Sequence, residues 1–378
     1  MTRPTRHPRR RAICLLVALA IAVPGACGPT VPVTPAPSPS PTTSVTSPSP
    51  SAVGPTATAS GGPIGTATWT AVQPSGGPPA ARDGHSWSVD PSSAVAYLFA
   101  GRGAAGDLDD LWAYDMTADA WQRLEPAGPR PPPRHDHAAA WIDGLGLVIA
   151  GGRSSSGVLA DLWAYDPSAD GWRTLGTSGP APAGRSGACG ALGGDGSWWL
   201  YGGAGADGAA LAELWRYDPG GSAWTEAAVD AGPLGRVDAA CWWASAGRFV
   251  VYGGRPRSDG ATQADGTIWS LDPTSFGGAQ VWSSVTGPPG ADRARAAGTS
   301  NGDVGVLVGG LGPDGAPRSD LTVVGAEGAT LLGPGTTGPT ARSGGALVAD
   351  PEGERLLLFG GLGPAGPTND VWGLTLPS

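Results

Sequence analysis

Six arginines recur along the chain at roughly 50-residue intervals, a period long enough for one small structural unit. They are Arg82, Arg134, Arg185, Arg236, Arg293 and Arg342, with Arg295 as a second candidate in the fifth unit. Each precedes an apolar segment typical of a strand. A guanidinium group presents a planar fork of donors that pairs well with carboxylates. The arginines therefore indicate either recognition of an acidic ligand or internal pairing with acids such as Asp110, Asp161 and Asp370.

Other groups that could do chemistry are few. His85 and His137 hold the same position in successive units, with His135 beside the second, but no cysteine or carboxylate completes a metal-ligand set at a suggestive spacing. No nucleophile elbow indicates a Ser/His/Asp triad. All 23 basic residues are arginines, which excludes Schiff-base chemistry. We therefore assign no catalytic residue, no metal and no cofactor.

Two cysteines stand one residue out of register in neighbouring units. Cys189 lies four residues after Arg185, and Cys241 lies five after Arg236. Successive side chains of a strand point to opposite faces, so a pair shifted by one position can meet between two units. An oxidising compartment would favour a disulfide. The spacing leaves open either a Cys189–Cys241 disulfide or two buried thiols.

The elements that position these residues repeat six times. An apolar strand ends in a pair that begins with glycine: Gly101-Arg102, Gly151-Gly152, Gly202-Gly203, Gly253-Gly254, Gly309-Gly310 and Gly360-Gly361. About ten residues later a second strand follows, as DLWAYD from Asp110 and again from Asp161, and a third carries a tryptophan such as Trp121. With 64 Gly, 39 Pro and 15% charged residues, the composition suits short strands and turns. Each unit is expected to be a four-stranded antiparallel meander.

This pattern resembles the kelch repeat, over nearly the whole chain from about Ile64 to Ser378. The resemblance implies an all-β, six-bladed kelch-type β-propeller with one blade per repeat. The sixth copy stops after its third strand, whereas TATWTAV around Trp69 stands before the first copy. We expect this N-terminal strand to close the last blade. Ten of the 16 tryptophans fall on equivalent strand positions and are expected to pack blades together.

In a closed ring, the blade-opening arginines and the loops after the glycine pairs lie at the same end. These loops contain Arg102, Arg153, Asp207, Arg255, Arg257, Asp259 and Asp314. In kelch propellers similar to this one, some arginines at this strand start contact acidic partners. We expect the six blade-opening arginines to ring one mouth of the central channel and to bind an acidic ligand, with structural pairing as the alternative.

The N-terminal region is expected to direct export. Residues 1–26 combine an arginine cluster with a short apolar run and read as a signal peptide. Cys27 follows small residues, as in the lipobox of bacterial lipoproteins, although Pro24 departs from that pattern; lipidation at Cys27 is expected, with cleavage and release as the alternative. Residues 27–63 form a Pro/Ser/Thr-rich tether. The propeller then occupies 64–378.

Charge limits the class of partner. The formal charge is −9, and removal of residues 1–26 takes away five arginines, giving −9 − 5 = −14. Such an acidic protein is not expected to bind nucleic acid, or a membrane except through the lipid anchor. The sequence favours an exported, monomeric binding module for an acidic peptide or glycan at the cell surface. A carbohydrate-active enzyme, resembling a sialate epimerase or a degenerate oxidase, and a scaffold subunit of an envelope complex remain alternatives.

Overall fold

The computed structural model describes residues 67–376 apart from 231, 246, 258–263, 274–279, 326–327, 334–336 and 352–354. The chain divides into two units, Met1–Ser60 and Gly61–Ser378, and all described residues lie in the second. The expected signal peptide, Cys27 and the tether lie outside the described residues. In the described part every regular element is a strand, and no helix there could cross a bilayer.

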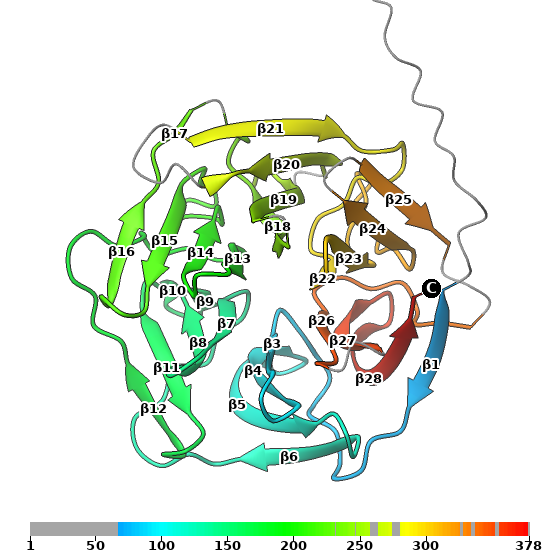
Figure 1. Cartoon of the computed structure of the whole chain (residues 1–378). Coiled ribbons are helices and arrows are strands. Elements are labelled where there is room, and N and C mark those ends of the chain that lie inside the picture. Colours follow the sequence, from blue (N-terminus) through cyan, green and yellow to red (C-terminus); the bar gives the residue numbers. More distant parts are fainter. Residues whose placement is uncertain are drawn as a thin grey trace, which may run out of the picture. The chain divides into compact units, whose positions relative to one another are not determined.

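Six sheets surround a central axis and form a six-bladed β-propeller (Figure 1). Blade 1 contains β2 (Arg82–Asp83), β3 (Ser86–Asp90), β4 (Val95–Gly103), β5 (Gly106–Asp115) and β6 (Ala120–Leu124). Blade 2 contains β7 (Ala138–Ile142), β8 (Gly146–Ala150), β11 (Leu162–Asp166) and β12 (Gly171–Thr174), with the hairpin β9 (Arg153–Ser154) and β10 (Gly157–Val158). Blade 3 contains β13 (Cys189–Leu192), β14 (Trp198–Tyr201), β15 (Leu214–Asp218) and β16 (Ala223–Glu226).

The other three blades repeat this order. Blade 4 contains β18 (Val237–Ala244), β19 (Arg248–Arg255), β20 (Thr267–Leu271), β21 (Gln280–Thr286) and the short β17 (Val229–Asp230). Blade 5 contains β22 (Ala297–Asn301), β23 (Val304–Val308), β24 (Leu321–Gly325) and β25 (Gly328–Leu332). Blade 6 contains β26 (Ala346–Ala349), β27 (Leu356–Gly363), β28 (Gly366–Thr375) and β1 (Thr68–Val72). Blades 1 and 4 thus add a fifth strand to the expected four, and β17 pairs parallel to β21.

The first and last strands of the described chain share one sheet. β1 pairs antiparallel with β28 (Figure 1). In this pairing Trp69 lies opposite Leu374. The Trp69 side chain is 5% exposed and packs in the core between blades 5 and 6 with Leu356 and Leu358. The outer strand of blade 6 therefore comes from the start of the domain.

The repeated DLWAYD segment is explained by contacts inside each blade. The Asp110 carboxylate accepts hydrogen bonds from Arg82 and from the Trp112 indole N–H, the latter at 2.7 Å. Four residues after Asp110, the Tyr114 hydroxyl donates to Asp119 at 2.6 Å, which fixes the turn to the outer strand. The copy that begins at Asp161 makes the same contacts. The segment is repeated almost unchanged in blades 1 and 2, where it makes the same hydrogen bonds between strands.

Outer-strand tryptophans fill the spaces between blades. Trp69, Trp121, Trp172, Trp224 and Trp282 are buried, as is Trp215, whereas Trp112, Trp163, Trp269 and Trp372 are half-buried. Trp121 lies 5.1 Å from Phe359 of the preceding blade, measured between ring centroids. The expected packing role of these ten residues agrees with their positions.

The glycine pair of blade 1 differs from the sequence prediction. Ala100 has φ = 56°, close to the 61° of Gly151 and the 65° of Gly360, which open the pairs in blades 2 and 6. The pair in blade 1 is therefore Ala100-Gly101 and not Gly101-Arg102. An alanine in this left-handed conformation is uncommon. The shift places Arg102 at the first position beyond the pair, equivalent to Arg153.

Candidate functional site

The six blade-opening arginines are buried inside the blades. The Arg82 side chain has no exposed surface and donates to both Asp110 oxygens at 2.6 and 2.7 Å. Its other hydrogen bonds go to the carbonyl oxygens of Ala100 and Ala80, at 2.8 and 2.9 Å. All of these partners belong to the arginine's own repeat. Arg82 therefore clamps the start of its blade to β4 and β5.

Each of the other blades contains an equivalent clamp. The pairs and their shortest N–O distances are Arg134–Asp161 at 2.6 Å, Arg185–Glu213 at 2.6 Å, Arg236–Asp265 at 2.5 Å, Arg293–Asp320 at 2.9 Å and Arg342–Asp370 at 2.6 Å. All six arginines are at most 9% exposed. Their forks are occupied by acids of the protein, so the expected ligand-binding ring of Arg82, Arg134, Arg185, Arg236, Arg293 and Arg342 gives way to the structural alternative.

The clamps set the ionisation of their acids. Burial alone would raise the pKa of Asp161, but the hydrogen bonds and positive charge of Arg134 outweigh burial and lower that pKa below its usual value. The same balance lowers the pKa of Asp110 and of Asp370. These three acids therefore stay ionised at neutral pH, and their clamps are ion pairs.

Two residues beyond each blade-opening arginine, the backbone forms a closed ring around the axis. Its members, here called the axial ring, all have positive φ: Gly84 (64°), Asp136 (51°), Gly187 (66°), Asp238 (60°), Arg295 (59°) and Gly344 (65°). Each member's N–H donates to the carbonyl of its neighbour in the adjacent blade at 2.8 Å, and the bond from Gly84 to Gly344 completes the circle. The axial ring joins all six blades.

The side chain of Arg295 reaches from blade 5 across the axial ring to acids of blades 1 and 2. It donates to Asp83 and to Asp136, both at 2.6 Å. A Cβ atom on Gly84 would lie 2.5 Å from an Asp136 oxygen, and one on Gly344 would lie 2.9 Å from an Arg295 nitrogen. The glycines thus leave space for a charged cluster at the axis. Burial opposes the charge on Arg295, yet its acidic neighbours raise its pKa.

A second ion pair borders the axial ring. Arg255 donates to one Asp238 oxygen from Nε at 3.0 Å and from Nη2 at 2.6 Å. Burial, together with the negative charge of Asp136, raises the pKa of Asp238 despite this partner. The guanidinium group of Arg255 is therefore engaged inside the protein.

A cavity of about 430 Å³ lies at this end of the channel. Its lining, here called the loop mouth, consists of Asp83, Arg102, Gly103, Ala104, His135, Asp136, Arg255, Arg295, Leu311, Ser343, Leu362 and Pro367. Arg102 is exposed, and its side chain makes no hydrogen bond or ion pair within residues 67–376 as far as they are described. The same holds for the half-buried Arg153 on the neighbouring blade. These two guanidinium groups can donate hydrogen bonds to a carboxylate of a ligand.

The other loop residues named by the sequence have varied roles. Asp207 caps the backbone N–H of Ala209 at 3.0 Å, and Arg257 donates to the Asp207 carbonyl. Asp314 caps Ala316 and lies 3.6 Å from Arg318. These contacts shape the loops. Asp259 lies outside the described residues.

His135 and His137 each contact a polar side chain, whereas neither ring nitrogen of the buried His85 has a hydrogen-bond partner among the described residues. His135 Nδ1 lies 2.8 Å from an Asp107 oxygen, and His137 Nε2 lies 2.8 Å from the Ser86 hydroxyl. Burial, with the nearby Arg134 charge, lowers the pKa of His137 to about 3, so this imidazole is neutral and a weak base. Among the described residues, no three His, Cys, Asp or Glu side chains are grouped to hold a metal ion.

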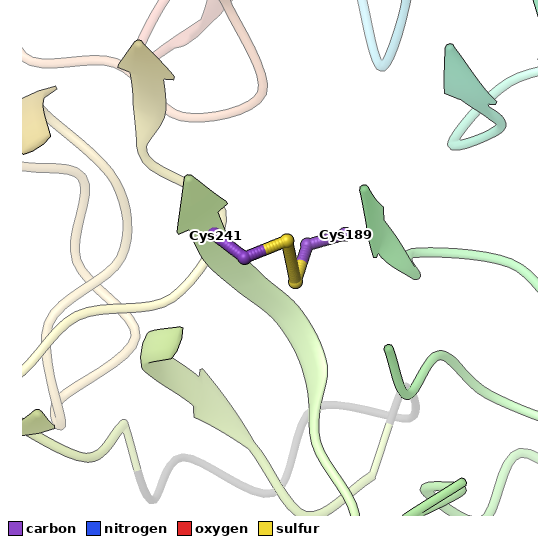
Figure 2. Close-up of a disulfide and its surroundings, with 2 residues drawn as sticks. All are labelled: Cys189 and Cys241. Atoms are coloured by element: carbon purple, nitrogen blue, oxygen red, sulfur yellow. A yellow bond between two sulfur atoms is a disulfide. The ribbon is translucent and has the colours of Figure 1, made fainter. Parts of the chain in front are cut away.

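Cys189 and Cys241 form a disulfide between the innermost strands of blades 3 and 4 (Figure 2). Their Cα atoms are 5.7 Å apart. Cys189 pairs with Tyr201 in β14, whereas Cys241 lies one residue beyond the equivalent Ala240. The offset of one position thus turns the two side chains toward each other.

The opposite end of the channel has a different character. A cavity of about 370 Å³ there is lined by residues of all six innermost strands, including Trp141, Leu192, Trp243 and Ser300. Its lining contains no charged side chain. This end is called the turn mouth.

The axial ring was not predicted from the sequence, nor was the difference between the loop arginines Arg102 and Arg153, unpaired in the described part of the chain, and the paired Arg255. Five of the six axial-ring positions hold Gly or Asp, residues that tolerate positive φ. This recurrence two residues after each blade-opening arginine could have predicted the positive φ of the ring. Arg295 departs from this pattern, and the sequence predicted it only as a second candidate for the blade-opening arginine of the fifth unit. Arg102 and Arg153 were noted, but only side-chain contacts distinguish them from Arg255.

Comparison with known proteins gives several partial matches. A family model described as the KLHDC2/KLHL20/DRC7 Kelch-repeats domain matches residues 63–254. The chain is 33% identical over 139 residues to acyl-CoA-binding domain-containing protein 4 of Arabidopsis thaliana, covering 36% of this chain and 20% of that protein. It is 32% identical over 112 residues to Kelch repeat-containing protein 2 of Saccharomyces cerevisiae, covering 28% and 13%. It is 29% identical over 219 residues to Adagio-like protein 3 of Oryza sativa, covering 54% and 34%. The matches thus span about a third or less of these relatives.

Proposed function

Because the chain belongs to the kelch-repeat family of β-propellers, we propose that it is an exported binding module whose loop mouth holds an acidic segment of a partner protein. The kelch propeller fold supports a role as a protein-interaction module. The observation that carries the acidic preference is the exposed Arg102, which borders a cavity of about 430 Å³ and has no partner in the described part of the chain. Arg153 adds a second cation on the adjacent blade.

A guanidinium group without an internal acid gains most from a ligand carboxylate. A charge-assisted hydrogen bond contributes about 1.5–3 kcal/mol when its donor is otherwise in water. The blade-opening arginines cannot offer this gain, since their acids already occupy them. The proposal therefore moves the acidic site from the buried clamps to the loop arginines at the same end of the channel. An acidic glycan would satisfy the same cations and is distinguished by the experiment below.

Export rests on two independent features. Residues 1–26 have the composition of a signal peptide, and the Cys189–Cys241 disulfide suits an oxidising compartment. A lipid anchor at Cys27 would hold the propeller at the outer face of the cell membrane through the tether. The Cys27→Ser variant should then lose its partition into detergent. Wild-type protein released wholly into the medium with a free N-terminus would contradict the anchor.

The acidic preference is tested with peptide and glycan arrays. The Arg102→Gln/Arg153→Gln variant should lose about tenfold or more in affinity for acidic peptides, at an unchanged thermal midpoint. Arg123→Gln is the matched control, because Arg123 is an exposed arginine on the outer strand of blade 1. Equal binding by both variants would reject the loop mouth as the acidic site. Binding to acidic glycans alone would replace the peptide as the ligand.

A further inference from the structure

The residue that follows each glycine pair occupies the same structural position in all six blades. The backbone pairing of this residue shows the equivalence, in addition to its place in the sequence repeat. In every blade this residue pairs antiparallel with the residue after the blade-opening arginine: Asp83–Arg102, His135–Arg153, Ser186–Ala204, Val237–Arg255, Ala294–Leu311 and Ser343–Leu362. The six side chains therefore start from matching backbone sites around the channel. Only their chemistry differs.

That chemistry gives four of the six positions, which form one arc, an apolar half and a basic half. Blades 5 and 6 contribute Leu311 and Leu362, and blades 1 and 2 contribute Arg102 and Arg153. Blade 6 lies between blades 5 and 1 in the propeller (Figure 1). The sequence of side chains around this arc is thus apolar, apolar, basic, basic.

The apolar half is open to the solvent. Leu362 is 38% exposed, and it lies opposite Pro367 across the hairpin of β27 and β28. Leu311 is half-buried, and all three line the loop mouth. Leu311 and Leu362, here called the apolar wall, thus place apolar surface at the edge of a charged cavity. A partner group covering Leu362 would remove apolar surface from water.

The basic half can bind a carboxylate at the same time. Arg255, the third arginine of the six positions, is held by Asp238, which leaves Arg102 and Arg153. Arg102 is exposed and shares the cavity with Leu362. One ligand can therefore contact the cation of blade 1 and the apolar wall of blade 6 together.

We infer that the loop mouth recognises a peptide segment in which an acidic residue stands beside an apolar residue, the acid binding Arg102, with Arg153 as a second cation on the adjacent blade, and the apolar side chain covering Leu362 and Leu311. This inference rests on the proposed function and names the ligand more narrowly. It distinguishes the segment from a purely acidic run, which would leave the apolar wall uncovered.

The test is selection of a phage-displayed random heptapeptide library on the full chain and on two variants. Wild-type protein should enrich peptides with Asp or Glu within two positions of a large apolar residue. Leu311→Ser/Leu362→Ser should keep the acidic enrichment and lose the apolar one. Arg102→Gln/Arg153→Gln should lose the acidic enrichment. The single variant Leu362→Ser replaces the double variant if the latter has a lowered thermal midpoint.

The outcomes separate this inference from the proposed function. Acidic enrichment without apolar enrichment on wild-type protein overturns the amphipathic ligand and leaves the acidic site intact. No acidic enrichment on wild-type protein overturns both. For a synthetic peptide from the selection, Leu362→Ser should weaken binding about fivefold, as for loss of part of one apolar contact. An unchanged dissociation constant for that peptide would also overturn the inference.

Discussion

Replacement of Arg134 by methionine should destabilise the propeller more than any exposed arginine replacement. Arg134 is fully buried and donates four hydrogen bonds: two to Asp161 at 2.7 and 2.6 Å, one to Gly151 at 2.8 Å and one to Pro132 at 3.1 Å. Methionine fills a similar space but removes the donors of Asp161 Oδ1 and of the Gly151 and Pro132 carbonyl oxygens, and leaves Asp161 Oδ2 with Trp163 alone. Removing one partner of a buried ion pair typically costs about 3–5 kcal/mol.

The measurement is the thermal midpoint of unfolding by circular dichroism. For a domain of about 300 residues that unfolds in one transition, a loss of 3–5 kcal/mol lowers the midpoint by about 5–8 °C. Arg123→Gln should change the stability by no more than about 0.5 kcal/mol, because its side chain is exposed. If Arg134→Met unfolds at the wild-type temperature, the clamps do not hold the blades and this reasoning is refuted.

The same clamp predicts a pH dependence with a definite sign. The pKa of Asp161 is lowered in the folded state, so the clamp's contribution is present above the unfolded pKa of about 3.9 and is lost as the pH falls through the folded value. The difference in midpoint between wild type and Arg134→Met should therefore shrink below about pH 4. A difference that grows on acidification would contradict the ion pair.

Three further predictions concern the contacts between blades. Ala346→Ser should raise the midpoint by giving the unpaired His85 ring the hydroxyl partner that Ser86 gives the next histidine, worth about 1 kcal/mol; an unchanged or lower midpoint would refute this pairing. Trp69→Ala should cost about 3–5 kcal/mol because it empties the core beside the first strand, and a near-neutral result would reject ring closure through that strand. Reduction of the Cys189–Cys241 disulfide, whose sequence separation is 52, should lower the free energy of unfolding by about 4 kcal/mol. The measurement compares urea unfolding with reductant to unfolding without it, and identical curves would contradict a role of the disulfide as a cross-link.

Much of the fold could be predicted from the sequence because the residues that make similar contacts recur in each blade. An apolar strand that ends at a glycine, followed by a second strand about ten residues later, recurs six times in fixed order, and this count predicts six blades. The displaced pair in blade 1 could not be read, since Ala100 adopts a left-handed conformation that sequence assigns to glycine. Gly101 therefore seemed to open the pair.

The functional roles of the arginines were less readable. Arg82 and Asp110 are separated by 28 residues, as are Arg342 and Asp370, and Arg134 and Asp161 by 27. This nearly constant spacing agrees with internal pairing, although we expected a ligand-binding ring. The sequence could not show whether a side chain reaches inward or outward, because both arrangements need the same backbone. Arg102 became a candidate only once its surroundings were known.

The central claim, that the loop mouth is the ligand-binding end, is tested most directly by site-specific photo-crosslinking on intact cells. A benzophenone amino acid replaces Ala104, an exposed residue of the loop mouth, or Leu192, which is 38% exposed at the turn mouth. We expect a covalent adduct from position 104 that disappears when Arg102→Gln is added, and none from position 192. An adduct from position 192 alone, or one at 104 that is insensitive to Arg102→Gln, would contradict this account.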